Sequence, residues 1–356
     1  MKSNFIVTAI ITLSVILSTA TSARSQDFLK RADRSITDGT EKIALAYVID
    51  NIPDIPDAEI FSHLIYAFAV FNDNLDGVVI KYPEKLKALA KLKEKNPELK
   101  VMLGLNDYRR PGFSEMAGDK KKRKAYVKSV KEIIKTYNLD GADLDWEFPT
   151  IEGQGHNFTP EDDINYVKLV KDLRKALGKK AWISYYSNHT GRWIDHKGMV
   201  PYVSYVHVSG YNLSEPIEGK PLLHHSALYP ASKTGDWCVS KVIERHINLG
   251  IPKEKILMGI PFFGIGMSPY PKYVECKDFS KYSSGPLIKW DDDAKAPYIT
   301  DENDNLILGF DDERSIAAKF DFVRANQIPG IFVWNYEADY KDHKLGKAIK
   351  RLRKGN

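Results

Sequence analysis

The stretch Gly141-Ala142-Asp143-Leu144-Asp145-Trp146-Glu147-Phe148 is a strand-like run in which acidic and apolar residues alternate. Successive side chains of a strand point to opposite faces, so the three acids, Asp143, Asp145 and Glu147, share one face. The opposite face carries Leu144, Trp146 and Phe148. We therefore expect a strand that packs its apolar face against helices and turns its acids towards a polar interior.

Seven further runs of strand-like length and composition recur along the chain, separated by segments with helical spacing. The eight runs, each rich in Val, Ile, Tyr or Phe, are residues 43–48, 62–71, 100–105, 141–148, 181–186, 203–211, 256–263 and 330–334. Between two of them, Tyr166, Val170, Leu173 and Leu177 make one apolar helical stripe.

Strands that alternate with helices predict an α/β protein with a parallel sheet. The number eight favours a closed (β/α)8 barrel, the TIM barrel, whose active site lies at the C-terminal ends of the strands. An open, doubly wound sheet is the alternative. Residues 47–53, after the first run, contain no glycine, which disfavours a nucleotide-binding version of that fold.

One connection is longer than the others and follows the seventh run. It is rich in Gly, Pro, Asp and Ser, and it contains a predicted hairpin with strands at residues 298–300 and 306–310. We interpret residues 266–308 as a short insertion within one barrel that spans residues 27–356.

Residues 1–23 have the order of features of a secretory signal peptide. Lys2 precedes an apolar segment at residues 5–17, and Thr21 and Ala23 stand at positions −3 and −1 of a plausible cleavage site. This apolar segment is shorter than a typical transmembrane helix. We therefore expect a soluble mature protein that is secreted to the exterior or the periplasm, with no membrane partner after signal removal.

Composition is that of an ordinary globular protein. Of the 356 residues, 43% are hydrophobic and 28% are charged, which excludes a wholly disordered or fibrous chain. The formal charge of +5 is spread along the chain, and the lysine-rich run at residues 120–124 is typical of a solvated helix face. We expect a monomer with no nucleic-acid partner.

The chain has two cysteines. Cys238 and Cys276 form one disulfide or remain two thiols, and both alternatives stay open.

The acidic face of the run at residues 141–148 points to proton-transfer chemistry. Neighbouring carboxylates in a poorly solvated site cannot all ionise easily, so at least one pKa should rise. A raised pKa suits a general acid near neutral pH, and Glu147, nearest the C-terminal end, is the natural donor. The alternatives are a solvated surface strand and a carboxylate metal site. The run contains no His, and no complementary cluster has metal-ligand spacing, so we expect no metal and no cofactor.

The same residues resemble the signature of a known family. Glycoside hydrolase family 18, the chitinases, has the motif D-x-x-D-x-D-x-E, and Asp140, Asp143, Asp145 and Glu147 stand at its four fixed positions. Residues 61–68, 259–264 and 330–334 are similar to the family's second, seventh and eighth strands. Residues 209–212 fall where the family usually has Met-x-Tyr-Asp.

The resemblance implies roles for the motif residues. Family 18 enzymes retain anomeric configuration, and the substrate's own 2-acetamido group attacks C1 in place of an enzyme carboxylate. Glu147 would protonate the leaving oxygen, and Asp145 would orient the acetamido N–H and stabilise positive charge. Asp143 would share a proton with Asp145, Tyr211 would hold the acetamido carbonyl, and Asp140 would be structural.

Further residues would bind the sugar by the same resemblance. Trp334 would form the floor of the sugar site, and Tyr47 and Phe68 would line its pocket; ordinary core packing is the alternative for each. Asn212 replaces the usual Asp beside Tyr211. Asp107 follows the third strand where the family has a Gly-Gly turn, and it either adds a carboxylate at the mouth or caps the turn.

These residues imply a secreted chitinase that acts on chitin or chito-oligosaccharides. The short insertion suggests an open cleft and cutting within the polymer. One alternative is an endo-β-N-acetylglucosaminidase that acts on N-glycans. The other is a non-catalytic chitin-binding lectin, although such relatives typically lose the acid that Glu147 supplies here.

Overall fold

The computed structural model describes residues 40–106, 112–147, 149–152, 157–282 and 287–355. The predicted signal peptide and Asp107 lie outside these residues, as does Phe148.

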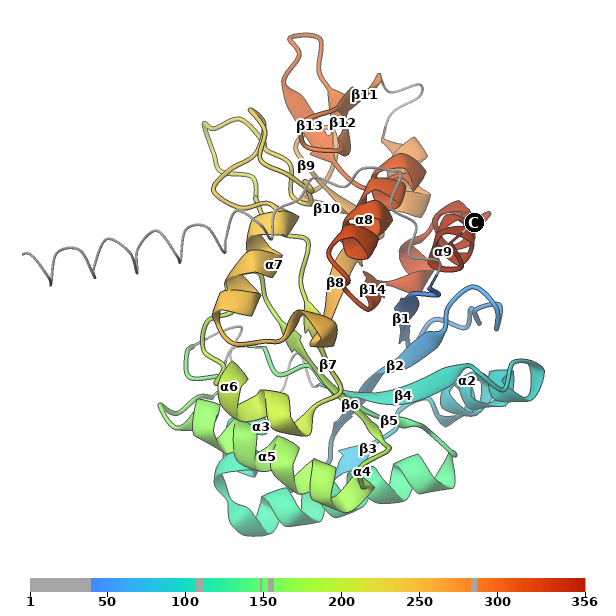
Figure 1. Ribbon diagram of the computed structural model, residues 1–356, viewed down its shortest axis with the longest axis vertical. Helices are drawn as coiled ribbons and strands as arrows, with labels where there is room; N and C mark the ends of the chain where they lie inside the picture. Colours follow the sequence, from blue (N-terminus) through green and yellow to red (C-terminus); the bar gives the residue numbers. More distant parts are fainter. Residues whose placement is uncertain (1–39, 107–111, 148, 153–156, 283–286, 356) are drawn as a thin grey trace, which may run out of the picture.

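Eight parallel strands form a closed barrel in the described part of the chain, which confirms the predicted (β/α)8 fold (Figure 1). The strands are β1 (Ile43–Ile49), β2 (His63–Phe71), β4 (Lys100–Leu105), β5 (Gly141–Leu144), β6 (Trp182–Ser187), β7 (Tyr205–Val208), β8 (Ile256–Pro261) and β14 (Gly330–Trp334). The barrel closes because β1 pairs in parallel with both β2 and β14. A two-residue strand, β3 (Val78–Val79), pairs antiparallel with β2.

The helices lie outside the strands (Figure 1). They are α2 (Pro83–Lys95), α3 (Phe113–Gly118), α4 (Lys120–Thr136), α5 (Asp162–Leu177), α6 (His196–Met199), α7 (Val239–Asn248), α8 (Glu313–Ala325) and α9 (Lys344–Arg353), with short 3-10 turns η1 (Val200–Tyr202), η2 (Lys253–Lys255), η3 (Cys276–Lys281) and η4 (Tyr336–Ala338). Asp312 starts α8 with a capping box, in which its side chain and Ser315 bond each other's backbone N–H. None of the described helices combines the length and apolar character needed to cross a membrane.

The alternation in the acidic strand matches the packing of β5. Leu144 and Trp146 belong to the large apolar cluster between strands and helices. The Trp146 ring stacks on Phe113 of α3 at 5.2 Å and lies 4.9 Å from Tyr166 of α5. The outward face of this strand is therefore fixed by helix packing, which leaves the inward face for the acids.

The long connection after β8 forms a second sheet, which stands at the top of the molecule in Figure 1. Its antiparallel strands are β9 (Phe263–Gly266), β10 (Tyr273–Glu275), β11 (Ile288–Asp291), β12 (Ala296–Thr300) and β13 (Leu306–Gly309), in the order β10-β9-β13-β12-β11. The predicted hairpin is present as the β12–β13 pair. This sheet continues directly from the C-terminal end of β8, so it stands beside the mouth of the barrel.

The two cysteines are free thiols in the structure, so the disulfide alternative is wrong. Both are buried, but in different places. Cys238 packs with Ala227, Ala294 and Ala296 before α7, whereas Cys276 belongs to the main core. Because each thiol is enclosed by a separate apolar cluster, the two sulfur atoms do not meet.

Candidate active site

The three acids of the β5 segment rise from the barrel interior to its mouth. Ladder pairing ends at Leu144, earlier than the predicted run, although the Asp145 N–H still donates to the Leu105 carbonyl at 3.0 Å. Asp143 is fully buried, Asp145 is 6% exposed and Glu147 is partly exposed. Burial thus decreases along the series in the direction of the cleft.

Asp143 is held at the bottom by three neighbouring side chains. The Tyr47 hydroxyl donates to Asp143 Oδ2 at 2.8 Å, and the Ser184 hydroxyl donates to Oδ1 at 2.6 Å. His207 Nδ1 lies 3.2 Å from Oδ1 and 2.8 Å from the Tyr47 hydroxyl. Burial lowers the pKa of His207, which favours a neutral ring. These residues tie β1, β5, β6 and β7 together beneath the cleft.

Asp145 has one oxygen with a partner and one without. Asn106 Nδ2 donates to Asp145 Oδ2 at 3.0 Å, whereas Oδ1 is buried and has no hydrogen-bond partner among the described residues. Burial, and then the charges of Glu147 and Asp143, raise the pKa of Asp145 well above its usual range. An unpaired buried acceptor is costly unless a ligand completes it. Asp145 is therefore suited to receive a donor from a bound molecule.

Glu147 has the protonation state that a general acid needs. Burial raises its pKa to about 7. A carboxyl group with this pKa keeps a large share of its proton at neutral pH and can still release it.

A cavity of about 860 Å³ opens above these acids. This volume falls within the usual range for small-molecule sites. Its aromatic lining comes from Tyr47, Phe68, Tyr186, Tyr211, Phe263, Tyr273, Tyr282 and Trp334. The Trp334 ring lies 5.4 Å from Tyr47 and is nearly parallel to Phe68 at 6.0 Å. Flat rings beside carboxyl groups are suited to a ligand with apolar faces and polar edges.

A comparison with protein-family models identifies the family of this chain. The model described as "Glycosyl hydrolases family 18" matches residues 37–339, most of the chain. The chain belongs to this family.

Individual family 18 relatives are distant. An endochitinase of Manduca sexta is 24% identical over 81% of this chain and 60% of that protein. Chitinase A1 of Niallia circulans is 24% identical over 71% of this chain and 42% of that protein. The solved structure of a family 18 N-acetylglucosaminidase from Paenibacillus barengoltzii covers 87% of this chain and 99% of its own, with 26% identity and a TM-score of 0.77. This chain therefore spans only about half of the length of these two curated relatives.

Two family motif positions have different places in the structure. Asp140 does not line the cavity; its Oδ2 accepts bonds from Lys93 Nζ at 2.9 Å and from the Val101 N–H at 2.8 Å, which joins α2 to β4. Asn212 does line the cavity, with a left-handed φ of 56°. Its Oδ1 is buried without a partner in the described part of the chain. Asp107 lies outside the described residues.

Several cavity residues were not predicted from the sequence. Asn106 and Tyr186 lie at the C-terminal ends of β4 and β6, a position that signals the mouth of a barrel. The wall made by β10 and the following turn η3 had no such signal. It includes Tyr273, Glu275, Asp278 and Tyr282. Glu275 pairs with Lys277 at 2.5 Å and Asp278 with Lys281 at 2.7 Å. This wall is therefore polar but largely charge-compensated.

Proposed function

We propose that this family 18 protein hydrolyses β-1,4-linked N-acetylglucosamine polymers or oligomers with retention of configuration. The observation that carries the proposal is the pair of adjacent carboxyl groups. Glu147 has a pKa near 7, and Asp145 presents an oxygen without a partner among the described residues in an aromatic cavity. The names of the relatives, endochitinase and N-acetylglucosaminidase, support the same sugar.

In the proposed reaction the substrate supplies its own nucleophile. Glu147 gives its proton to the leaving oxygen as the bond from that oxygen to C1 breaks. The 2-acetamido carbonyl oxygen forms the new bond to C1, giving an oxazolinium ion. Water then opens this ion while Glu147 takes the proton back. Holding the acetamido group against C1 makes the attack intramolecular, which lowers its entropic cost.

The neighbouring residues would hold the acetamido group in place. The free Oδ1 of Asp145 accepts the acetamido N–H, and the Tyr211 hydroxyl donates to the carbonyl oxygen. Asp145 can pass its own proton towards Asp143, whose two oxygens already accept bonds from Tyr47 and Ser184. Trp334, Phe68 and Tyr47 pack against the apolar face of the sugar.

Two finer features are also proposed. The second sheet that walls the cleft is short, so we propose an open cleft and cutting within the polymer. We also propose that the protein acts as a monomer. Early products longer than dimers would support this mode, whereas dimers alone would contradict it. We further propose export with cleavage after Ala23, which N-terminal sequencing of the mature protein tests.

The direct test is hydrolysis of an N-acetylglucosamine hexamer, followed by mass spectrometry. We expect wild type to cleave it and Glu147→Gln to leave it intact. Glu132→Gln, the same change on the exposed face of α4, is the matched control and should cleave normally. Binding without cleavage by wild type would point to a lectin. Cleavage of N-glycoprotein, with the hexamer untouched, would point to the endo-β-N-acetylglucosaminidase alternative.

A further inference from the structure

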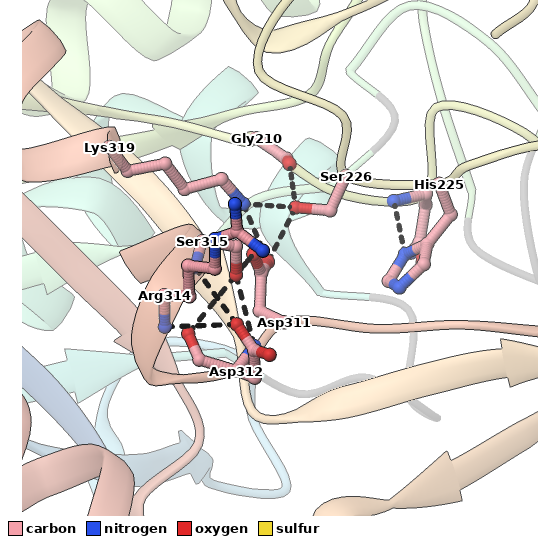
Figure 2. Close-up of polar contacts among 9 residues, drawn as sticks. Gly210, His225, Ser226, Asp311, Asp312, Arg314, Ser315 and Lys319 are labelled. Carbon is pink, nitrogen blue, oxygen red and sulfur yellow. Dashed lines mark hydrogen bonds and ion pairs between the residues drawn. The ribbon is translucent and has the colours of Figure 1, made fainter. Parts of the chain in front are cut away.

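A fully buried ion pair lies outside the cavity lining and is linked through Ser226 to Gly210, the residue before Tyr211 (Figure 2). Lys319 of α8 and Asp311, just before that helix, have no exposed surface, and Lys319 Nζ lies 2.5 Å from Asp311 Oδ2. Burying two charges costs free energy that an apolar pair would not. Stability alone therefore does not explain why this pair of charges is buried here.

Ser226 links this pair to the chain beside Tyr211. Lys319 Nζ donates to Ser226 Oγ at 2.6 Å, and Ser226 Oγ lies 2.8 Å from both Asp311 Oδ2 and the Gly210 carbonyl oxygen. A serine hydroxyl has a single proton to donate. Asp311 Oδ2 can accept from both Lys319 and Ser226, so the Ser226 proton is shared between this carboxylate and the Gly210 carbonyl oxygen. Figure 2 shows Lys319 and Asp311 meeting at the Ser226 hydroxyl, which in turn reaches the Gly210 carbonyl.

The segment that carries Tyr211 is sharply shaped and held from both sides. A Cβ on Gly210 would lie 2.3 Å from the Gly259 carbonyl oxygen, so the backbone here packs closely on β8. Asn212 takes a left-handed φ of 56°, and the next N–H, of Leu213, donates to the His225 carbonyl at 3.0 Å. Residues 225 and 226 therefore fix the chain immediately before and after Tyr211.

We propose that Lys319, Asp311 and Ser226 form a positioning triad that fixes the Gly210 carbonyl and, through it, the direction of the Tyr211 hydroxyl. The inference rests on the proposed function, in which that hydroxyl holds the acetamido carbonyl oxygen. The triad touches no substrate and acts only through the backbone. Tyr211 places its hydroxyl at the far end of a long side chain, so a small rotation of the 210–211 peptide displaces it. A misplacement of about 1 Å can cost about 100-fold in rate.

Ser315 offers a matched control within the same network. Its hydroxyl donates to the other oxygen of Asp311, Oδ1, at 2.5 Å and belongs to the α8 capping box, and no contact with Gly210 is described for it. Ser226→Ala and Ser315→Ala therefore remove the same group from the same carboxylate. Only Ser226→Ala releases the Gly210 carbonyl.

The experiment compares kcat and KM of these two variants on the N-acetylglucosamine hexamer, with thermal melts of each. We expect Ser226→Ala to lower kcat by about 10- to 100-fold with little change in KM. Ser315→Ala should lose stability but keep kcat within about twofold. If Ser226→Ala does not melt cooperatively, Ser226→Cys, whose thiol is a weak donor, takes its place with the same expected loss.

A double-mutant cycle with Tyr211→Phe identifies the route of the effect. If the triad acts through the Tyr211 hydroxyl, adding Ser226→Ala to Tyr211→Phe lowers kcat by no more than about twofold further. If the double variant instead loses kcat by the product of the two single losses, the inference is wrong. Equal kcat values for Ser226→Ala and Ser315→Ala in an active protein would also overturn it. An inactive wild type would instead overturn the proposed function, and this inference with it.

Discussion

At the scale of single residues, two carboxyl groups on one strand are treated differently by their surroundings. Asp145 is the more buried, and Asn106 holds one of its oxygens. Glu147 stands nearer the solvent, and burial raises its pKa to about 7. Pairs of acids whose environments differ in this way divide the acid and the orienting roles between them.

The pH dependence of kcat/KM follows from the Glu147 pKa. The proton donor acts only while protonated, so activity is full below the pKa and is lost as pH rises through it. We expect kcat/KM on the hexamer to be level below about pH 7 and to fall about tenfold per pH unit above it. A profile that stays flat from about pH 6 to about pH 9 would contradict Glu147 as the acid.

Asn106 should matter through Asp145. Its amide is the donor described for Asp145 Oδ2, and it lowers the pKa of that carboxyl against the effect of burial. Asn106→Ala should therefore raise the Asp145 pKa further and reduce kcat by about tenfold, the size expected for one lost hydrogen bond to an acid. Asn96→Ala, at the C-cap of α2 and outside the cavity lining, is the control for the same change. Equal kcat values of the two variants would show that Asn106 does not support Asp145 in the reaction.

At the scale of elements, the eight barrel strands could be predicted because each is an apolar run of the right length. Their ends could not. The run at residues 141–148 continues with alternating residues, but ladder pairing stops at Leu144, before the two acids that line the cavity. Likewise, nothing in the sequence around Asn106, a polar residue directly after β4, marks it as a partner of Asp145.

Adjacent residues of the β5 segment should give opposite phenotypes. Trp146 packs on Phe113 and Tyr166, whereas Glu147 lines the cavity. Trp146→Ala should lower the free energy of unfolding by about 3–5 kcal/mol, measured by urea denaturation. Glu147→Gln should abolish hydrolysis with little change in stability. A Trp146→Ala variant of normal stability but no activity would show that Trp146 faces the cleft.

At the scale of the whole molecule, the barrel and its acidic centre followed from local pattern, and the cleft wall did not. Tyr273 and Glu275 of β10 and Asp278 of η3 lie far along the chain and line the same cavity as Glu147 only because of the fold. The pairing state of Cys238 and Cys276 also depends on tertiary packing. Two buried thiols in separate clusters cannot be distinguished from a disulfide by spacing alone.

Because both cysteines are free thiols, we expect a reductant to leave the thermal stability of the protein unchanged. Loss of a native disulfide usually costs about 2–5 kcal/mol. Because both thiols are buried and unpaired, excess dithiothreitol should leave the melting temperature unchanged. A thiol reagent should detect both cysteines only after denaturation. A melting temperature that falls by about 5 °C or more on reduction would contradict this.

In the proposed mechanism, Glu147 acts with the help of the substrate's own acetamido group. Proton NMR of the hexamer reaction, recorded before the products mutarotate, tests it most directly because it reports the anomer formed at the new reducing end. We expect the β-anomer to appear first with wild type and no product to appear with Glu147→Gln. An initial α-anomer, or cleavage that survives in Glu147→Gln, would contradict it.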